Sequence, residues 1–297
     1  MKKILLIPQI EILNANALSS PYTIGFPAMT AWLGATHALE RQLREMDYPN
    51  LRFKSMAVVC HHINLQTYKG AGDYVHSIIG TGNPLDKTGK RPSFIEEARC
   101  HLTVSLIMEY EGLGLSDGDI FAENAEQVLK GKMKLAGGDI LKTAQAKLQE
   151  IDDEAEHKAL MRSLMPGHCL IERRDLMQQA MATGQDAIDA LLDYLKVTHR
   201  SHVDEQEKIT WHSERKEKGW IVPIATGFHG ISELGQAKNQ RDPETPHRFA
   251  ESIITLGEFI MPYRVTDLDQ MLWHYHTDLN TNLYLCQQNK QVNLSST

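Results

Sequence analysis

The fold is decided by residues 4–46, ILLIPQIEILNANALSSPYTIGFPAMTAWLGATHALERQLREM. Residues 4–13 are predicted to form a strand, because Ile10 and Ile12 alternate with Gln9 and Glu11, although Pro8 does not suit a strand interior. A loop of Asn, Ser, Gly and Pro follows over residues 14–27, and Pro27 suits the first position of a helix. From there a stripe of positions spaced by three and four predicts a helix with one buried face, formed by Met29, Trp32, Thr36, Leu39, Leu43 and Met46.

The next 130 or so residues continue this pattern of strands and helices. Alternation predicts further strands over residues 53–67, 101–108 and 168–172, and residues 119–164 are expected to be largely helical with a break at 132–138. The resulting order, β-α-β-β-α-β, is typical of a ferredoxin-like or RNA-recognition-motif-like domain, an α+β fold with helices on one face of an antiparallel sheet. We assign residues 1–173 to this domain, with helical insertions.

The C-terminal residues 174–297 are less regular, and they are expected to form an α/β part packed on the first, either separately or as one continuous domain. A sparsely aliphatic, highly charged stretch at residues 199–218 predicts a mobile connector. The other predicted elements are a helix over 175–195 with a break near Gly184, strands at 219–227, 249–261 and 282–286, and a helix over 267–276.

Composition excludes several classes of protein. The chain has 297 residues, with 42% hydrophobic and 23% charged, as in folded globular proteins. A formal charge of −7 weighs against simple electrostatic binding of nucleic acid. Four isolated cysteines without a CxxC pair predict buried thiols in a reducing compartment. Neither a signal-peptide core nor a membrane-length apolar run is present, so we expect a cytoplasmic protein without a membrane partner.

Motifs for cofactors and catalysis are missing. Fourteen histidines occur without an HExxH pattern, and neither GxxxxGK[ST] nor GxSxG is found, so we predict no metal, no cofactor and no catalytic residue. One enzymatic alternative stays open. A metal-independent ribonuclease needs a base for a 2′-hydroxyl and an acid for the leaving oxygen, and His37, His61, His62 or His101 are the candidates near a binding face.

Several polar positions are candidates for contacts with phosphate. Asn16, Ser19 and Ser20 offer neutral donors and acceptors just before a helix N-terminus, where backbone N–H groups favour phosphate, although Asn and Ser are also ordinary turn residues. Lys132 and Lys134 precede a glycine pair. Arg241 and Arg248 flank the turn at residues 242–246, where they reach phosphates or form structural ion pairs.

Many short blocks, in one order along the chain, resemble a known family, the 5′-handle-capping subunit of the type I-F CRISPR Cascade, also called the Csy complex. The blocks are residues 14–21, 25–28, 33–41, 58–61, 83–85, 96–106, 135–138, 164–167, 219–224, 241–246 and 248–249. The resemblance implies a non-catalytic assembly protein of the repeat-associated RNA-binding superfamily. It implies binding to the 5′ handle of the CRISPR RNA, pairing with the large, PAM-reading subunit and with a backbone subunit, and contact with target DNA only through the complex.

In this family guide processing belongs to a separate endoribonuclease, so the resemblance gives the histidines no catalytic role. It assigns the loop of Asn14, Asn16, Ser19 and Ser20 to the RNA or to a subunit contact. Phosphate contacts are expected next from Lys132, Lys134, Arg241 and Arg248. Two alternatives remain at this point: a ribonuclease that processes precursor guide RNA, and a protein scaffold without RNA contact.

The negative charge is concentrated in two stretches. Residues 109–126 hold six acids and no base, and residues 150–156 hold five acids and no base, so the rest of the chain carries +4. Exposed charges act over about 10 Å at ordinary ionic strength, so a basic RNA-facing loop is compatible with a net negative chain. We therefore predict that both acidic stretches face solvent or a basic partner, away from the guide.

Overall fold

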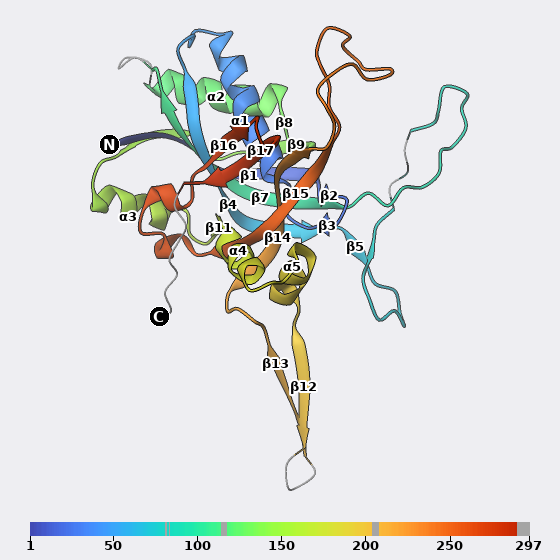
Figure 1. Cartoon of the computed structure of the whole chain (residues 1–297). Coiled ribbons are helices and arrows are strands. Elements are labelled where there is room, and N and C mark those ends of the chain that lie inside the picture. The colour runs from blue at the N-terminus through green and yellow to red at the C-terminus, as the bar shows by residue number, and fades with distance from the viewer. Residues whose placement is uncertain (81, 83, 114–117, 204–207, 290–297) are drawn as a thin grey trace.

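A computed structural model describes residues 1–80, 82, 84–113, 118–203 and 208–289. The N-terminal elements are β1 (Lys2–Asn16), β2 (Leu18–Ser20), β3 (Thr23–Ile24), α1 (Met29–Arg44), β4 (Arg52–Leu65), β5 (Thr67–Tyr68), β6 (Ser77–Ile78) and β7 (Arg99–Glu111) (Figure 1). The central elements are α2 (Gly118–Lys132), β8 (Lys134–Leu135), β9 (Gly138–Lys142), β10 (Lys147–Ile151), α3 (Glu154–Ser163), β11 (His168–Glu172), α4 (Arg174–Ala182) and α5 (Ala187–Leu195). The C-terminal elements are β12 (Thr198–Val203), β13 (Ile209–Glu214), β14 (Trp220–Gly230), β15 (Ala250–Ile260), the 3-10 turns η1 (Pro262–Arg264) and η2 (Leu268–Gln270), β16 (Trp273–Asp278) and β17 (Leu283–Gln288).

Most strands join one antiparallel sheet of 11 strands. Its order is β11-β15-β14-β17-β16-β4-β7-β1-β9-β8, and β10 pairs with the other part of the same edge of β1. The prediction of a mixed α and β protein with an antiparallel sheet is therefore confirmed. The strands predicted at residues 4–13, 53–67, 101–108, 168–172, 219–227, 249–261 and 282–286 are confirmed as β1, β4, β7, β11, β14, β15 and β17.

The two faces of β1, β4 and β7 are covered by different helices. On one face α1 and α2 pack a core that includes Trp32, Leu39 and Phe121, so the predicted apolar stripe of α1 is confirmed. Its last member, Met46, lies beyond the helix end and is exposed. On the other face α3 and the turns η1 and η2 cover only the part of the sheet around Ile4. The predicted break near Gly184 is confirmed as the junction of α4 and α5.

Two predicted helical segments are strands instead. The helix expected over 139–151 is wrong, because β9 and β10 pair with the edge of β1 in this region. The helix expected over 267–276 is also wrong, because only η2 is helical and β16 lies between β4 and β17. The buried Trp273 indole N–H donates to the Leu170 carbonyl at 3.0 Å. Strand pairing outweighs local propensity in both segments, with distant β1 for β9 and β10 and mainly with the adjacent β17 for β16.

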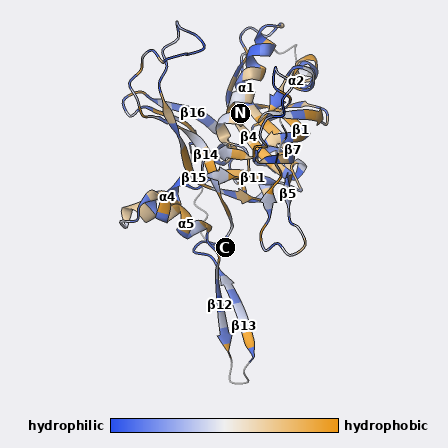
Figure 2. Ribbon diagram, turned by 90° about the vertical axis from the view of Figure 1, so that its right-hand side faces the viewer, coloured by the Kyte–Doolittle hydropathy of each residue, from blue (hydrophilic) through white to orange (hydrophobic). Residues whose placement is uncertain are grey.

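The connector expected over 199–218 is a regular hairpin formed by β12 and β13. It projects from the body as an arm, with an apolar patch on β13 (Figure 2). The base of this arm is fixed, because Lys216 Nζ lies 2.9 Å from Asp193 and 4.4 Å from the centre of the Tyr194 ring. The missed signal is the alternation of exposed Ile209 and Trp211 with polar neighbours.

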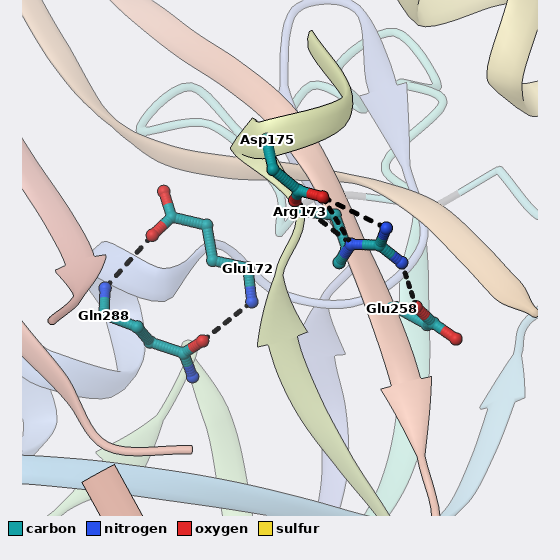
Figure 3. Close-up of polar contacts among 5 residues, drawn as sticks. All are labelled: Glu172, Arg173, Asp175, Glu258 and Gln288. Carbon is teal, nitrogen blue, oxygen red and sulfur yellow. Dashed lines mark hydrogen bonds and ion pairs between the residues drawn. The ribbon is translucent and has the colours of Figure 1, made fainter. Parts of the chain in front are cut away.

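A buried polar network joins β11 and α4 to the C-terminal strands (Figure 3). Arg173 pairs with Glu258 on β15 and with Asp175 at 3.1 Å, and both Arg173 and Glu258 are buried. Beside it, Glu172 and Gln288 exchange backbone-to-side-chain hydrogen bonds of 2.8 and 3.1 Å. These paired charges tie two sequence-distant parts of the sheet together.

Candidate nucleic-acid interface

The segment predicted as a loop, residues 14–20 and here called the Asn14–Ser20 loop, contains the last residues of β1, which still pair with β7 beyond a bulge, and all of β2. Asn14 has a positive φ of 57°, a conformation that asparagine tolerates better than most residues. Its N–H donates to His101 Nδ1 at 3.1 Å, while its side chain is exposed. Asn16 is also exposed, and its carboxamide accepts from Leu18 N and donates to Leu18 O, both at 3.1 Å. The two asparagines therefore shape the loop while remaining accessible.

The two serines stabilise the short hairpin of β2 and β3. Thr23 Oγ1 lies 2.9 Å from the Ser19 hydroxyl and 2.7 Å from the Ser20 hydroxyl. Ser20 is buried and also accepts the N–H of Tyr22 at 3.1 Å. We conclude that Ser19 and Ser20 act mainly by fixing the loop conformation.

The 132–138 turn, residues 132–138, lies directly against this loop. Asn16 N–H donates to the Ala136 carbonyl at 2.8 Å. A Cβ atom on Gly138 would lie 2.6 Å from Ile12 Cγ2, so only glycine fits this contact with β1. The structure thus brings two sequence-predicted groups, residues 14–20 and Lys132 with Lys134, to the same end of β1.

The lysines of the 132–138 turn border an open groove along α1. Lys132 is exposed and makes no ion pair among the described residues, whereas Lys134 pairs with Asp139 at 2.6 Å. Both side chains of that pair are 62% exposed, so the pair contributes little and can exchange for a phosphate. The facing side of α1 carries only small residues, Ala31, Gly34, Ala35 and Ala38.

Arg241 and Arg248 lie elsewhere, in the segment between β14 and β15. Arg241 is exposed. Arg248 is half-buried, donates to Asn282 Oδ1, and packs so closely on Gly230 that a Cβ there would meet its Cδ at 2.5 Å. No contact within the described residues connects these arginines to the Asn14–Ser20 loop.

Two of the four histidines considered for ribonuclease chemistry, His61 and His101, use ring nitrogens in hydrogen bonds. His61 Nδ1 donates to the Pro166 carbonyl at 2.6 Å, and its Nε2 accepts from the Ser105 hydroxyl at 2.7 Å. Ser105 in turn accepts the N–H of Gln9 at 3.1 Å. His101 uses one nitrogen on Asn14. Since a general base needs a free nitrogen, His61 is unsuited to that role in this conformation.

We next consider the side chains that could bind a metal ion or act as reactive thiols in the described part of the chain. Within it, no three His, Cys, Asp or Glu residues are grouped so that they could hold a metal ion. All four cysteines are buried, and burial raises the pKa of Cys60 to about 12 and that of Cys100 to about 11. Among the same residues, no helix has both the length and the apolar character needed to cross a membrane.

The two acidic stretches meet at the opposite end of β1. Lys3 pairs in register with Glu150 of β10, and their charged groups lie 3.6 Å apart. Lys2 pairs with Glu109 of β7 at 3.3 Å. The candidate surface and the main acidic cluster therefore occupy opposite ends of the same strands, which the sequence order alone does not reveal. Of the acids in the first stretch, Asp117 lies outside the described residues.

Comparisons with known proteins identify the class first: the chain is a CRISPR-associated protein. Residues 5–286 match the family model described as CRISPR-associated protein (Cas_Csy2). A relative from Pseudomonas aeruginosa (strain UCBPP-PA14), CRISPR-associated protein Csy2, is 35% identical over 311 residues, covering 95% of this chain and 94% of the relative. The chain belongs to the Csy2 family, and the type I-F resemblance of its sequence blocks is confirmed.

Proposed function

We propose that this chain is a non-catalytic subunit of a type I-F CRISPR RNA-guided complex in the cytoplasm. In this role it holds the 5′ handle of the guide RNA and pairs with the large, PAM-reading subunit and a backbone subunit, and it meets target DNA through the complex. The observation that carries the proposal is the junction of the Asn14–Ser20 loop with the 132–138 turn, formed by the hydrogen bond from Asn16 to Ala136.

The junction has the chemistry that single-stranded RNA requires. Lys132 and Lys134 supply cations for phosphates, and the small residues of α1 beside them let a backbone approach closely. The exposed carboxamide of Asn14 can donate to and accept from a base edge, as readout of unpaired bases demands. Ser19 and Ser20 contribute by holding the loop in shape.

Strand order supports a ferredoxin-like domain over residues 1–173. The neighbours β4-β7-β1-β9 are antiparallel, α1 connects β1 to β4, and α2 connects β7 to the strands at the far edge of β1. These connections match the β-α-β-β-α-β topology. Residues 174–297 would then be a C-terminal extension whose strands continue the same sheet.

Arg241 and Arg248 belong to the proposal as a separate phosphate-binding pair. Arg241 is exposed, whereas Arg248 already donates to Asn282. We therefore expect substitution of Arg241 to affect RNA binding more directly than substitution of Arg248.

The test is assembly with RNA. The chain is co-expressed with the large and backbone subunits and the guide RNA of its own locus, and the affinity for handle RNA is measured at several salt concentrations. The K132A/K134A variant should still assemble, but its salt slope should fall by about 1.4, the sum expected for two lost single-strand phosphate contacts. The matched control is K54A/K158A, which removes two exposed cations from the acidic end.

Three outcomes would contradict the proposal. A chain that stays a free monomer with all partners present is not a subunit of the complex. Assembly with unchanged RNA affinity in K132A/K134A and in R241A/R248A favours a protein scaffold. Specific cleavage of precursor RNA by the pure chain, lost on substitution of His61 or His101, would establish the ribonuclease alternative.

A further inference from the structure

A second cationic feature lies outside the proposed handle surface, in the long loop between β4 and β7 (Figure 1). We call residues 86–91, with the sequence DKTGKR, the basic turn. One Asp86 oxygen accepts the Thr88 N–H at 2.7 Å, the Thr88 hydroxyl at 2.6 Å and the Lys90 N–H at 3.0 Å. A backbone hydrogen bond from Asp86 to Lys90 at 3.0 Å and a positive φ of 76° at Gly89 complete it. The turn is thus a defined structure.

The basic turn has three cations, Lys87, Lys90 and Arg91. All three are exposed, and none forms an ion pair within the described residues. Hydrogen bonds from Thr88 and Lys90 lower the pKa of Asp86, so that residue is ionised and the turn carries a net charge of +2.

An apolar surface accompanies the cations. The Arg91 guanidinium lies 5.7 Å from the centre of the Phe94 ring, which is 69% exposed, and Leu85 is 65% exposed. Arginine stacked on an exposed aromatic ring, with lysines beside it, is a combination that suits phosphates and sugars of a nucleic-acid strand.

The location fits such a strand. The two roots of the loop are joined by the hydrogen bond from Gln66 N to Arg99 O at 2.8 Å, and the Ala98 carbonyl accepts from Ala17 N of the Asn14–Ser20 loop at 2.9 Å. The loop then extends away from the sheet (Figure 1), on the end of the molecule opposite the Lys3–Glu150 acidic cluster. A polyanion approaching the basic turn therefore avoids the main concentration of negative charge.

We propose that the basic turn, with Phe94, binds the phosphodiester backbone of a nucleic-acid strand at a place separate from the 5′-handle surface. Two strands supply that chemistry in an RNA-guided complex: the guide RNA beyond its handle, and the DNA duplex that the complex engages. Contacts of this kind are independent of base sequence, because lysine and arginine read only the phosphates.

The test uses the complex assembled as above, or the full chain alone, with labelled guide RNA and labelled duplex DNA in separate titrations. The K87A/K90A/R91A variant should reduce the salt slope by about 2.7 if the contacted strand is duplex DNA and by about 2.1 if it is single-stranded RNA. The charge-keeping K87R/K90R/R91K variant should retain binding. The control K54A/K147A/K158A removes three exposed cations near the acidic end and should change neither titration.

Loss with either probe supports the proposal and identifies the strand. Unchanged slopes with both probes, or an equal loss in the control, would overturn it. The K132A/K134A variant is titrated in parallel, because its salt slope for handle RNA should fall while the contact made by the basic turn is kept. Failure of the handle proposal and failure of this one are therefore distinguishable.

Discussion

Glycine residues show what single positions in the matching sequence blocks do. Gly138 approaches β1 and Gly167 approaches His61, and in each case a side chain would overlap neighbouring atoms. Each glycine thus lets its turn pack closely against the sheet. Their presence in the sequence blocks has a packing reason as well as any functional one.

Gly167→Ala should destabilise the protein by about 1–3 kcal/mol, because the new Cβ would lie 2.6 Å from the Leu164 carbonyl and 2.8 Å from His61 Nδ1. Urea unfolding measures the change. Gly131→Ala in α2 is the matched control, since nothing lies within 4 Å of its Cβ position, and it should be neutral or stabilising by up to about 1 kcal/mol. Equal stability of the two variants would show that the contact at Gly167 is relaxed.

The four thiols should be unreactive in the native protein. Burial raises the pKa of Cys60, Cys169 and Cys286 to about 12 and that of Cys100 to about 11, and only a thiolate attacks a disulfide reagent. An aromatic disulfide reagent at pH 8 should label none of them rapidly until the chain is unfolded. Rapid labelling of any one would place that thiol at the surface.

The same shifts predict a pH dependence. The folded chain keeps its thiol protons above the ordinary cysteine pKa of about 8.5, whereas the unfolded chain releases them. The thiol contribution to stability is therefore complete below about pH 8.5 and is lost as pH rises toward 12. Urea midpoints measured from pH 8 to 10 should fall, and a rise over that interval would contradict the assigned burial.

Arg173→Met should cost about 3–5 kcal/mol, because it leaves Glu258 as an unpaired charge in the interior. The double variant R173M/E258L removes both charges and should be more stable than the single one. Urea unfolding of R173M, E258L, the double variant and the parent chain gives the coupling energy. A double variant less stable than R173M would mean that the pair itself is strongly favourable.

At the scale of elements, the sequence predicted those strands and helices whose pattern is local. One face of α1 and one face of β7 are buried. Because burial requires apolar side chains at regular spacing, both elements can be recognised from the sequence. The strands β9 and β10 could not be found this way, because their polar sequences are extended through pairing with distant β1, and in β9 also with β8. The pattern of neighbouring residues does not predict which distant strand a segment pairs with.

The candidate site shows the same limit. Asn14 and Lys132 were found from residue type and block resemblance, but their proximity depends on the hydrogen bond between Asn16 and Ala136, 120 positions apart. In the sequence, residues 86–91 show only three cations around Gly89. Its defined shape comes from the hydrogen bonds of Asp86.

The arm of β12 and β13 should be dispensable for folding. None of the arm's described residues, 198–203 and 208–214, belongs to the three apolar cores, and an isolated hairpin contributes little stability in water. Replacing residues 198–214 by a short Gly-Ser linker should leave the melting temperature and the near-ultraviolet circular dichroism almost unchanged. The control deletion of residues 134–142 removes buried Leu135 and Gly138 and should prevent folding.

At the scale of the whole molecule, charge is separated along the strands. β1 has 15 residues, so at about 3.3 Å per residue its ends lie roughly 50 Å apart, several times the Debye length of about 8–10 Å. The net charge of −7 is thus an average over two ends that do not sense each other. The net negative charge is therefore compatible with nucleic-acid binding at the end of β1 far from the acidic cluster.

Cross-linking of the assembled complex should reflect this separation. Ultraviolet cross-links from guide RNA are expected in peptides that contain residues 14–20 or 132–138. None is expected in peptides from residues 109–111 or 150–156, because the acids there repel phosphate. RNA cross-links concentrated at the acidic end would reverse the proposed orientation of the subunit.

β1 has a further consequence for how the protein is made. It leaves the ribosome first, yet its partner β7 begins at Arg99, and β9 and β10 come later still. At about 5–20 residues per second, the apolar run at residues 4–7 waits roughly 5–20 s for a partner strand. During that interval an unpaired strand is open to association with other nascent chains. Soluble yield should therefore respond more to slower synthesis or to chaperone supply than to substitutions at the proposed RNA-binding end.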